Sequence, residues 1–445
     1  METNMTEGKE WKLILLFMLP MMGAGVLQFL YAAVDSVIIG NFIGSDALGA
    51  VGIPGPLIWL LNGINSGAGM GTSIVLAHFY GAGEKKRLRD GARTALLLYT
   101  LFGAVWTVLY LCLAKPVLWG FMNAPAEMRD MSYTYFSVYC LGIVPQLLYN
   151  VIYGILRAHG DSKSSLLFLA VAALLNTGLD LLFVVVFRMG VAGAAWATIL
   201  AQAGSAAASF FYMWKKYGNL RLTRGDLRFD RNEVFQNLRM SLPIMLQSSV
   251  ACLGFLFLQR LVNSFGSASI EGFAAVSKAE DIAWIPMTCF GGAVSAFTGQ
   301  NMGAGRIDRV RSGFRSSLWL VLFFGVFLGT LLYLTKTPVL RLFNLSGDAM
   351  LRAREQLDLM AVFLFVMGFH NAASGLMQGV GQVRLPAFAS IVNLGTRIGL
   401  AYWMAGTEIG FRSIYYSMPP AWILTAFLYM VGYRRLTRTH TVEKG

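Results

Sequence analysis

Charge is what this sequence lacks most. Only 13% of its 445 residues are Asp, Glu, Lys or Arg, whereas 56% are hydrophobic. Soluble domains usually carry about 25% charged residues. A surface of this composition could not be covered with charged groups, so the sequence excludes an ordinary soluble enzyme and predicts a protein that buries its surface in lipid.

Cysteine and histidine are scarce as well. The four cysteines, Cys112, Cys140, Cys252 and Cys289, all lie in apolar stretches and show no paired spacing. The sequence therefore predicts neither a disulfide framework nor a cysteine metal site, and we expect four small buried side chains. The four histidines share no ligand spacing either.

Apolar runs long enough to cross a membrane recur along the whole chain. A helix rises about 1.5 Å per residue, so about 20 residues cross a hydrocarbon core of about 30 Å. Barrel strands would instead alternate polar and apolar residues, and these runs are continuous. We predict an all-α membrane protein with twelve transmembrane helices near residues 12–36, 51–80, 92–114, 132–157, 165–187, 190–214, 240–262, 272–300, 316–335, 355–380, 386–405 and 411–433.

The basic residues explain the net charge of +13. Most of the Lys and Arg residues fall in alternate loops, starting with the N-terminal segment, and this positive-inside bias predicts that both termini are cytoplasmic. The expected location is the cell membrane, with lipids as partners. The basic stretch 215–239 is expected to be a solvated linker near anionic headgroups rather than a nucleic-acid site.

The sequence repeats itself at an offset of about 222 residues. Leu19-Pro20 returns as Leu242-Pro243, and Gly81-Ala82-Gly83 returns as Gly303-Ala304-Gly305. Each half then holds six spans, and an even number makes the two repeats parallel, with a substrate cleft expected between them. The predicted domains are an N-terminal six-helix lobe (1–214), a cytoplasmic linker (215–239), a C-terminal six-helix lobe (240–434) and a cytoplasmic tail (435–445).

Polar side chains inside the spans are the candidate functional residues, because each costs a few kcal/mol to insert. Asp180 follows Asn176 by four residues, which puts both on one helix face. The helical rise places Asp35 and Thr198 at a comparable depth. Two carboxylates, an amide and a hydroxyl suit either Na⁺ or a proton shared between two acids, and both ions stay open.

Three further candidates lie on the first span. Gln28 and Tyr31 are expected to line the cavity of the first half, although hydrogen bonds between helices would explain them equally well. Pro20 can kink the span.

These features resemble the multidrug and toxic compound extrusion (MATE) transporters, in particular their archaeal-type, DinF-like branch. The resemblance covers nearly the whole chain. Besides the paired Gly-Ala-Gly loops, it is carried by Tyr31–Gly40 (YAAVDSVIIG), Ala47–Gly52 (ALGAVG), Gly299–Asn301 (GQN) and Asn176–Asp180 (NTGLD). It implies a V-shaped fold that exports amphipathic, often cationic compounds by alternating access, driven by Na⁺ or H⁺.

The resemblance also implies roles for residues. The cation would bind Asp35, Asn176, Asp180 and Thr198, with the backbone of Ala194 as a further ligand.

The resemblance also implies that the first helix bends at Pro20 and that this bend couples cation occupancy to the shape of the cavity. A carboxylate that some members carry on helix seven has no counterpart in Gln247–Cys252 (QSSVAC), so coupling through the second half is not expected. No cofactor beyond the coupling ion is implied, and we expect a monomer that binds small molecules.

Two other functions would also fit parts of this pattern. A lipid-linked oligosaccharide flippase would share the architecture, but further C-terminal helices would be expected. An intramembrane aspartyl protease would need a Gly-x-Gly-Asp signature, which is absent around Asp180 (NTGLDL), and it would leave the repeat unexplained. We therefore expect a transporter rather than an enzyme.

Overall fold

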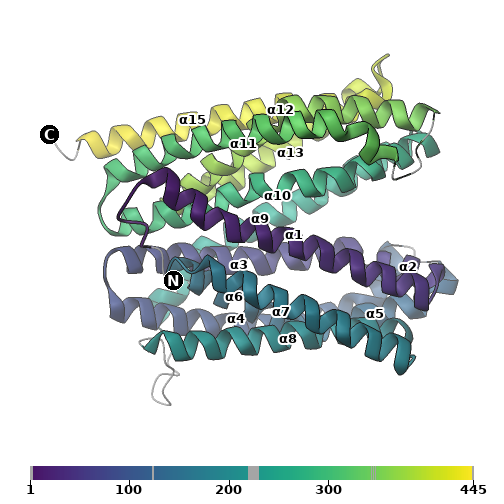
Figure 1. Ribbon diagram of the computed structural model, residues 1–445, viewed down its shortest axis with the longest axis horizontal. Helices are drawn as coiled ribbons and strands as arrows, with labels where there is room; N and C mark the ends of the chain where they lie inside the picture. Colours follow the sequence, from purple (N-terminus) through teal and green to yellow (C-terminus); the bar gives the residue numbers. More distant parts are fainter. Residues whose placement is uncertain are drawn as a thin grey trace. The chain divides into compact units, whose positions relative to one another are not determined.

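The computed structural model describes residues 4–122, 125–218, 230–341, 343, 345 and 347–442, and these are helical almost throughout, without a strand among them (Figure 1). The α-helices are α1 (Glu10–Phe42), α2 (Ser45–Gly52), α3 (Gly55–Gly81), α4 (Lys85–Lys115), α5 (Arg129–Leu141), α6 (Ile143–Ala158), α7 (Ser162–Asp180), α8 (Gly190–Lys216), α9 (Arg231–Asn263), α10 (Ser267–Gly303), α11 (Ile307–Arg341), α12 (Gly347–Gly379), α13 (Arg384–Ala405), α14 (Ser413–Tyr416) and α15 (Met418–Val442).

The long helices account for the twelve predicted spans. Among the described residues, 8 helices are long and apolar enough to cross a membrane alone. Two more spans are helix pairs: α2 and α3 meet at 43°, and α5 and α6 meet at 46°. Pro54 and Gly142 lie at these breaks, as expected of residues that interrupt helices. The remaining two predicted spans correspond to α13 and α15, so the all-α membrane fold is confirmed.

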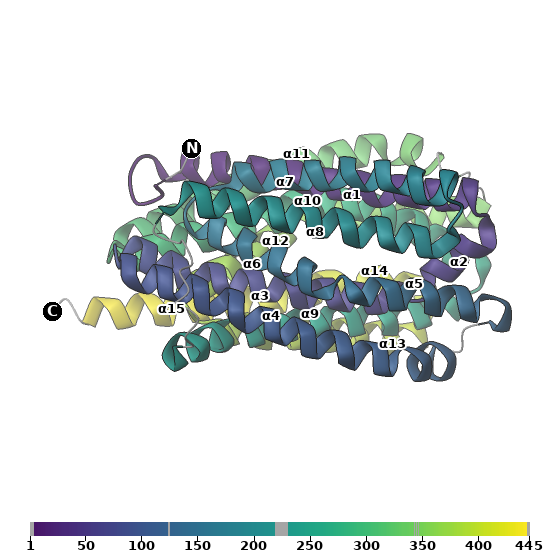
Figure 2. The ribbon, with the colours of Figure 1, turned by 90° about the horizontal axis from the view of Figure 1, so that it is seen from below.

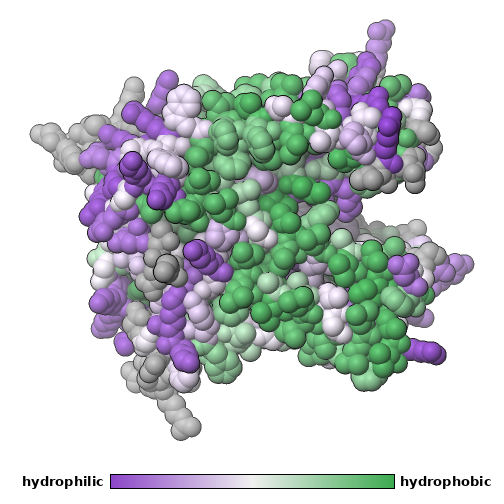
Figure 3. Space-filling view, viewed as in Figure 1, coloured by the Kyte–Doolittle hydropathy of each residue, from purple (hydrophilic) through white to green (hydrophobic). Residues whose placement is uncertain are grey.

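The surface of these helices is apolar where a soluble protein would be polar. Leu174 is 77% exposed and Trp319 is 73% exposed. On the face shown in Figure 3, hydrophobic side chains cover the middle of the helices in each unit, and hydrophilic ones gather toward the helix ends. This distribution is typical of helices that meet lipid tails along their length and water at their ends.

The chain divides into two compact units that do not follow the chain order strictly. Unit 1 contains Leu19–Met245 and unit 2 contains Met5–Met18 and Leu246–Gly445. The first part of α1 thus belongs to unit 2, and the first part of α9 belongs to unit 1. Pro20 and Pro243 lie inside these helices, within a few residues of each change of unit. Residues 219–229 of the predicted linker lie outside the described residues.

The first part of α9, which belongs to unit 1, packs closely against α3 and α4. In unit 1, the Tyr99 hydroxyl donates a hydrogen bond to Ser241 Oγ (2.5 Å). A Cβ on Gly71 would lie 2.1 Å from the same oxygen, and one on Gly67 would lie 2.9 Å from Met245. Glycine at these two positions of α3 therefore allows the close approach of α9.

The segment Met5–Met18 of unit 2 has buried apolar side chains and is also held by polar contacts. Asn301 Nδ2 donates to the carbonyl oxygen of Met5 (3.0 Å), and Arg309 pairs with Glu10 (3.4 Å). Arg87 pairs in the same way with Glu233 in unit 1 (3.4 Å). These two ion pairs occupy corresponding positions in the repeat.

Glycine contacts show the repeat in three dimensions. In unit 1, α3 and α6 cross at Gly69 and Gly154; in unit 2, α10 and α12 cross at Gly291 and Gly375. A Cβ on Gly154 would lie 2.1 Å from the Gly69 carbonyl oxygen, and one on Gly375 would lie 2.2 Å from that of Gly291. The same crossing therefore occurs at corresponding positions of both repeats.

Candidate cation site

Helices α1, α7 and α8 of unit 1 bring together the four side chains that the sequence singles out. Asn176 and Asp180 lie on α7, and Thr198 lies on α8, which is beside α7 in both views (Figures 1 and 2). Asn176 Nδ2 donates to Thr198 Oγ1 (3.5 Å). On α1, the carboxyl group of Asp35 is close enough to that of Asp180 for each to influence the other electrostatically.

The oxygens of this group are buried and lack partners. Asn176 and Asp180 are fully buried, and Thr198 is 5% exposed. Asp35 Oδ1, Asn176 Oδ1 and both carboxyl oxygens of Asp180 form no hydrogen bond with any described residue. A buried polar oxygen without a donor is costly. A ligand that accepts electron pairs, such as a cation or a proton, would satisfy all four oxygens.

Of the other predicted site residues, Tyr31 and Ala194 lie at the site, whereas Gln28 is exposed. The Tyr31 hydroxyl is buried beside Thr198 and Asp35, outside hydrogen-bond geometry with any described group. Ala194 is buried on α8, one turn before Thr198. Gln28, in contrast, is exposed, and among the described residues no hydrogen bond joins it to this group.

The helix geometry changes immediately after Asp180. Residues Leu181–Val186 form a π-helix, in which the Phe187 amide donates to the Leu182 carbonyl oxygen (2.8 Å). Arg188 then adopts a left-handed φ of 53°. Wider turns of this kind occur mostly as short segments and are frequent at functional sites; a second one, Pro116–Phe121, follows α4. Asp180 thus occupies the last α-helical position before the change.

A hydrogen-bonded network beside the site was not predicted from the sequence. Gln146 of α6 donates to Asn62 Oδ1 (2.6 Å) and to the Tyr139 hydroxyl (3.2 Å). Asn65 in turn donates to Gln146 Oε1 (2.8 Å). Tyr139 is near enough to Tyr31 to interact electrostatically. The signal was present, since Asn62 and Asn65 lie one turn apart in an apolar span.

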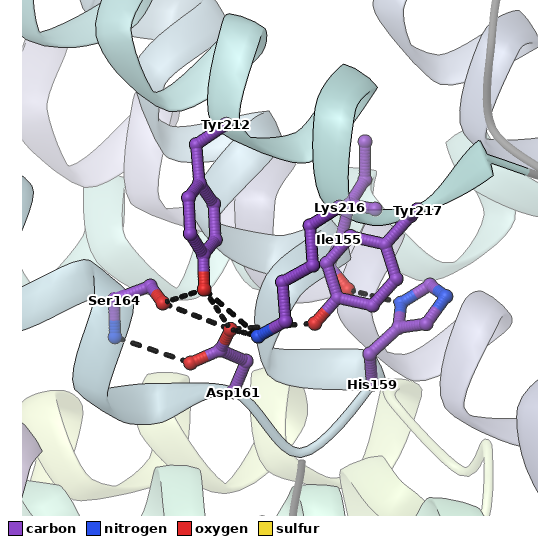
Figure 4. Close-up of polar contacts among 7 residues, drawn as sticks. All are labelled: Ile155, His159, Asp161, Ser164, Tyr212, Lys216 and Tyr217. Carbon is purple, nitrogen blue, oxygen red and sulfur yellow. Dashed lines mark hydrogen bonds and ion pairs between the residues drawn. The ribbon is translucent and has the colours of Figure 1, made fainter. Parts of the chain in front are cut away.

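A second polar cluster lies at the end of unit 1 where α7 begins and α8 ends (Figure 4). Asp161 caps α7 by accepting a hydrogen bond from the Ser164 amide (3.1 Å). Its Oδ2 accepts bonds from Lys216 Nζ (2.6 Å), the Tyr212 hydroxyl (3.1 Å) and the Tyr217 hydroxyl (3.3 Å). This cluster ties the ends of two helices together.

The electrostatics of Asp161 follow from these contacts. The residue is only 1% exposed, and burial by itself would raise the pKa of its carboxyl group. The hydrogen bonds from Lys216 and Ser164 outweigh that effect, so the pKa is lowered and the group stays charged. His159, beside the cluster, bonds the Ile155 carbonyl oxygen through Nδ1 (2.8 Å), so one nitrogen of its ring is used within its own helix turn.

Comparisons with known proteins agree with this architecture. The family model MatE matches residues 20–182 and again residues 243–403. The "Probable multidrug resistance protein YpnP" of Bacillus subtilis is 29% identical over 385 residues, which cover 85% of each chain. "Probable multidrug resistance protein YoeA" of the same organism is 26% identical over 432 residues, covering 95% of this chain and 93% of that one.

A solved structure gives the same picture of the fold. "Crystal structure of MATE in the bent conformation" has a TM-score of 0.92 at 23% identity and covers 99% of this chain and 98% of its own. The two matches of the family model begin at residues 20 and 243, in step with the internal repeat, and together they span more than half of the chain. The chain therefore belongs to the MatE family of multidrug efflux transporters, and it is a membrane transporter rather than an enzyme.

Proposed function

We propose that this transporter is an antiporter coupled to Na⁺ or H⁺, which exports amphipathic, often cationic organic compounds by alternating access. The cation would bind Asp35, Asn176, Asp180 and Thr198, with the backbone of Ala194 as a further ligand. Tyr31 and Gln28 would line the cavity of the same lobe. The two lobes of the proposal are residues 1–214 and 240–434.

One observation carries the proposal. Four buried oxygens of Asp35, Asn176 and Asp180 lack hydrogen-bond partners among the described residues. The helices that carry them are long and apolar enough to cross a membrane. Carboxylate, amide and hydroxyl oxygens are the ligands that hard cations prefer. Two adjacent carboxyl groups also resist simultaneous ionisation, which favours a shared proton when no metal ion is bound.

Coupling needs a difference in affinity between conformations. A cation can drive export only if it binds one state of the transporter more tightly than the other. Asp35 lies on α1, the helix that contains Pro20 and contributes to both units. A change in the bend at Pro20 would move Asp35 relative to Asp180 on α7, and this movement would link cation occupancy to the shape of the cavity.

The direct test is efflux of a cationic dye from proteoliposomes under an imposed Na⁺ gradient or an imposed pH gradient. Wild type is compared with Asp35→Asn and Asp180→Asn, and the matched control is Asp46→Asn, since Asp46 is exposed at the start of α2. We expect dye movement to follow one gradient, to be lost in both site variants and to persist in the control.

The outcomes separate the alternatives. Dye efflux that follows one gradient identifies the coupling ion. Efflux that is unchanged in Asp180→Asn would contradict the site. If folded protein moves no dye under either gradient, the export of dye-like compounds is contradicted, and a lipid-linked oligosaccharide becomes the substrate to test next.

The proposed location is the cell membrane, with both termini cytoplasmic and a monomer as the functional unit. The distribution of Lys and Arg between loops supports this orientation. Reporter fusions at each terminus, one active only in the cytoplasm and one active only outside, test it. An active external reporter at either terminus would overturn the orientation.

A further inference from the structure

A charged pocket of about 680 Å³ opens in unit 1 where α4 and α9 begin. This volume is within the range of about 300–1,000 Å³ that is usual for small-molecule sites. The pocket residues precede the apolar runs of these helices, which start near residues 92 and 240. The pocket therefore lies at the depth of lipid headgroups. Its lining residues are Lys86, Arg87, Asp90, Asp230, Arg231, Asn232, Glu233, Phe235, Gln236 and Arg239.

Glu233 is the buried acid of this pocket. It is 4% exposed, and its Oε1 accepts a bond from Arg87 Nε (3.4 Å). Its Oε2 has no hydrogen-bond partner among the described residues. Oε2 lies beside Gly91 of α4, where a Cβ would be 3.4 Å away. A buried carboxylate oxygen without a donor is unfavourable, so the pocket offers a position for a positively charged donor.

The other acids that line the pocket each accept bonds through one oxygen. Asp90 Oδ1 pairs with Arg93 (3.0 Å). Asp230 Oδ1 caps α9 by accepting a hydrogen bond from the Asn232 amide (2.8 Å). Among the described lining residues, Glu233 Oε2 is therefore the buried side-chain acceptor without a donor.

Three basic side chains of the pocket lack an acidic partner. Lys86, Arg231 and Arg239 form no ion pair with any described residue. Arg231 and Arg239 are eight residues apart, with Phe235 between them, so all three lie along one face of α9. Clustered Lys and Arg side chains of this kind suit a phosphate group.

We propose that this pocket binds a phosphate ester that carries a primary amine, with the phosphate on Lys86, Arg231 and Arg239 and the ammonium on Glu233 Oε2. The ethanolamine headgroup of a membrane phospholipid is the source that suits a pocket at this depth. Phe235, between Arg231 and Arg239, is 65% exposed and would pack against the carbon atoms of the headgroup. A choline headgroup has no N–H to donate, so the pocket would select against it.

Native mass spectrometry of the full chain in detergent tests the amine. Phosphatidylethanolamine and phosphatidylcholine with matched acyl chains are supplied in equal amounts. We expect wild type to retain the ethanolamine lipid about tenfold better, the effect of roughly one charge-assisted hydrogen bond. Glu233→Gln should bring the two lipids close to equal retention. Glu10→Gln is the matched control, because Glu10 is bonded to Ser312 (3.0 Å) and Arg309 in unit 2.

The phosphate contacts are tested on exposed residues, whose substitution should not affect folding. Lys86→Gln and Arg231→Gln should lower the retention of both lipids, whereas Lys163→Gln, an exposed lysine outside the pocket, should not. Equal retention of both lipids by wild type would overturn the proposal. So would the same loss in the control variants as in the pocket variants.

A competition arm identifies the source of the ligand. The ethanolamine lipid and free O-phosphoethanolamine are supplied in equal amounts. Preferential retention of the lipid supports a membrane source, whereas preferential binding of the free compound supports the same pocket chemistry with a soluble ligand and overturns the assignment to lipid.

Discussion

Gly154 and Gly69 touch through their backbones, so closely that a Cβ on Gly154 would lie 2.1 Å from the Gly69 carbonyl oxygen. No side chain fits at this distance, and α3 and α6 therefore approach each other only because both residues are glycine. Gly375 has the same relation to Gly291 in unit 2. We expect Gly154→Ala and Gly375→Ala each to destabilise the protein by about 1–3 kcal/mol through overpacking, measured as a lower midpoint of thermal unfolding in detergent.

Gly395→Ala on α13 is the matched control. A Cβ there would meet nothing within 4 Å, and Ala favours the helix over Gly by up to about 1 kcal/mol. Its unfolding midpoint should stay the same or rise. A fall as large as that of Gly154→Ala would show that close packing is not the cause.

The amide of Asn176 gives a second prediction. Asn176→Ala removes a buried oxygen of the candidate site, so the cation concentration for half-maximal efflux should rise about tenfold or more, as expected for the loss of one good ligand contact. The control is the neighbouring Thr177→Ala, because the Thr177 hydroxyl donates to Ala173 of its own helix (3.0 Å). Dye efflux titrated against cation measures both, and equal shifts would exclude a specific role for Asn176.

Pro20 gives a third. A proline inside a helix costs about 3 kcal/mol, so Pro20→Ala should raise the unfolding midpoint. If the bend couples cation binding to export, the same variant should lose most of its gradient-driven efflux. Pro338→Ala is the control, since Pro338 lies inside α11, away from the changes of unit. Full efflux by Pro20→Ala would contradict the coupling role.

Asp161 gives a pH prediction. Its pKa is lowered in the folded protein, so its stabilising effect is fully present above its ordinary pKa of about 4 and is lost as the pH falls through the lower folded value. The difference in unfolding midpoint between wild type and Asp161→Asn should therefore shrink in acid. A difference that stays constant would show that the charge of Asp161 contributes little.

Lys216 gives a fifth, related prediction. Lys216→Met should cost about 1.5–3 kcal/mol near neutral pH, the contribution of a hydrogen bond to a charged group. Lys163→Met removes an exposed lysine near the same helix end and should have no measurable effect. Equal losses in the two variants would indicate a general effect of charge rather than the bond to Asp161.

The apolar runs and the repeat were readable from the sequence because lipid imposes a length on each helix and duplication leaves matching motifs. The grouping of Asn176 with Asp180 was readable from helical periodicity, and the structure brings both together with Asp35 and Thr198. Whether this group binds a cation stays a prediction. Gln28 shows what helical periodicity cannot predict. It lies one turn from Tyr31, whose hydroxyl is buried, and yet its own side chain is exposed.

Other features could not be read from the pattern of apolar residues. The π-helix after Asp180 depends on backbone hydrogen bonds, which hydrophobicity does not encode. The network of Gln146, Asn62 and Tyr139 depends on which helices become neighbours. The grouping of Met5–Met18 with unit 2 likewise reflects contacts between distant parts of the chain; Pro20 lies near the change of unit, but a proline alone does not show which unit the preceding segment joins.

During synthesis, the first half of the chain leaves the ribosome without the segment that completes it. Ser241 receives the hydrogen bond of Tyr99, and Met245 packs against Gly67, so α3 and α4 keep an uncovered face until residues 231–245 have been made. Met5–Met18, in turn, is made long before the helices of unit 2 that receive it. The order of translation therefore imposes an order of assembly, and the two halves of the duplicated chain have to mature together rather than one after the other.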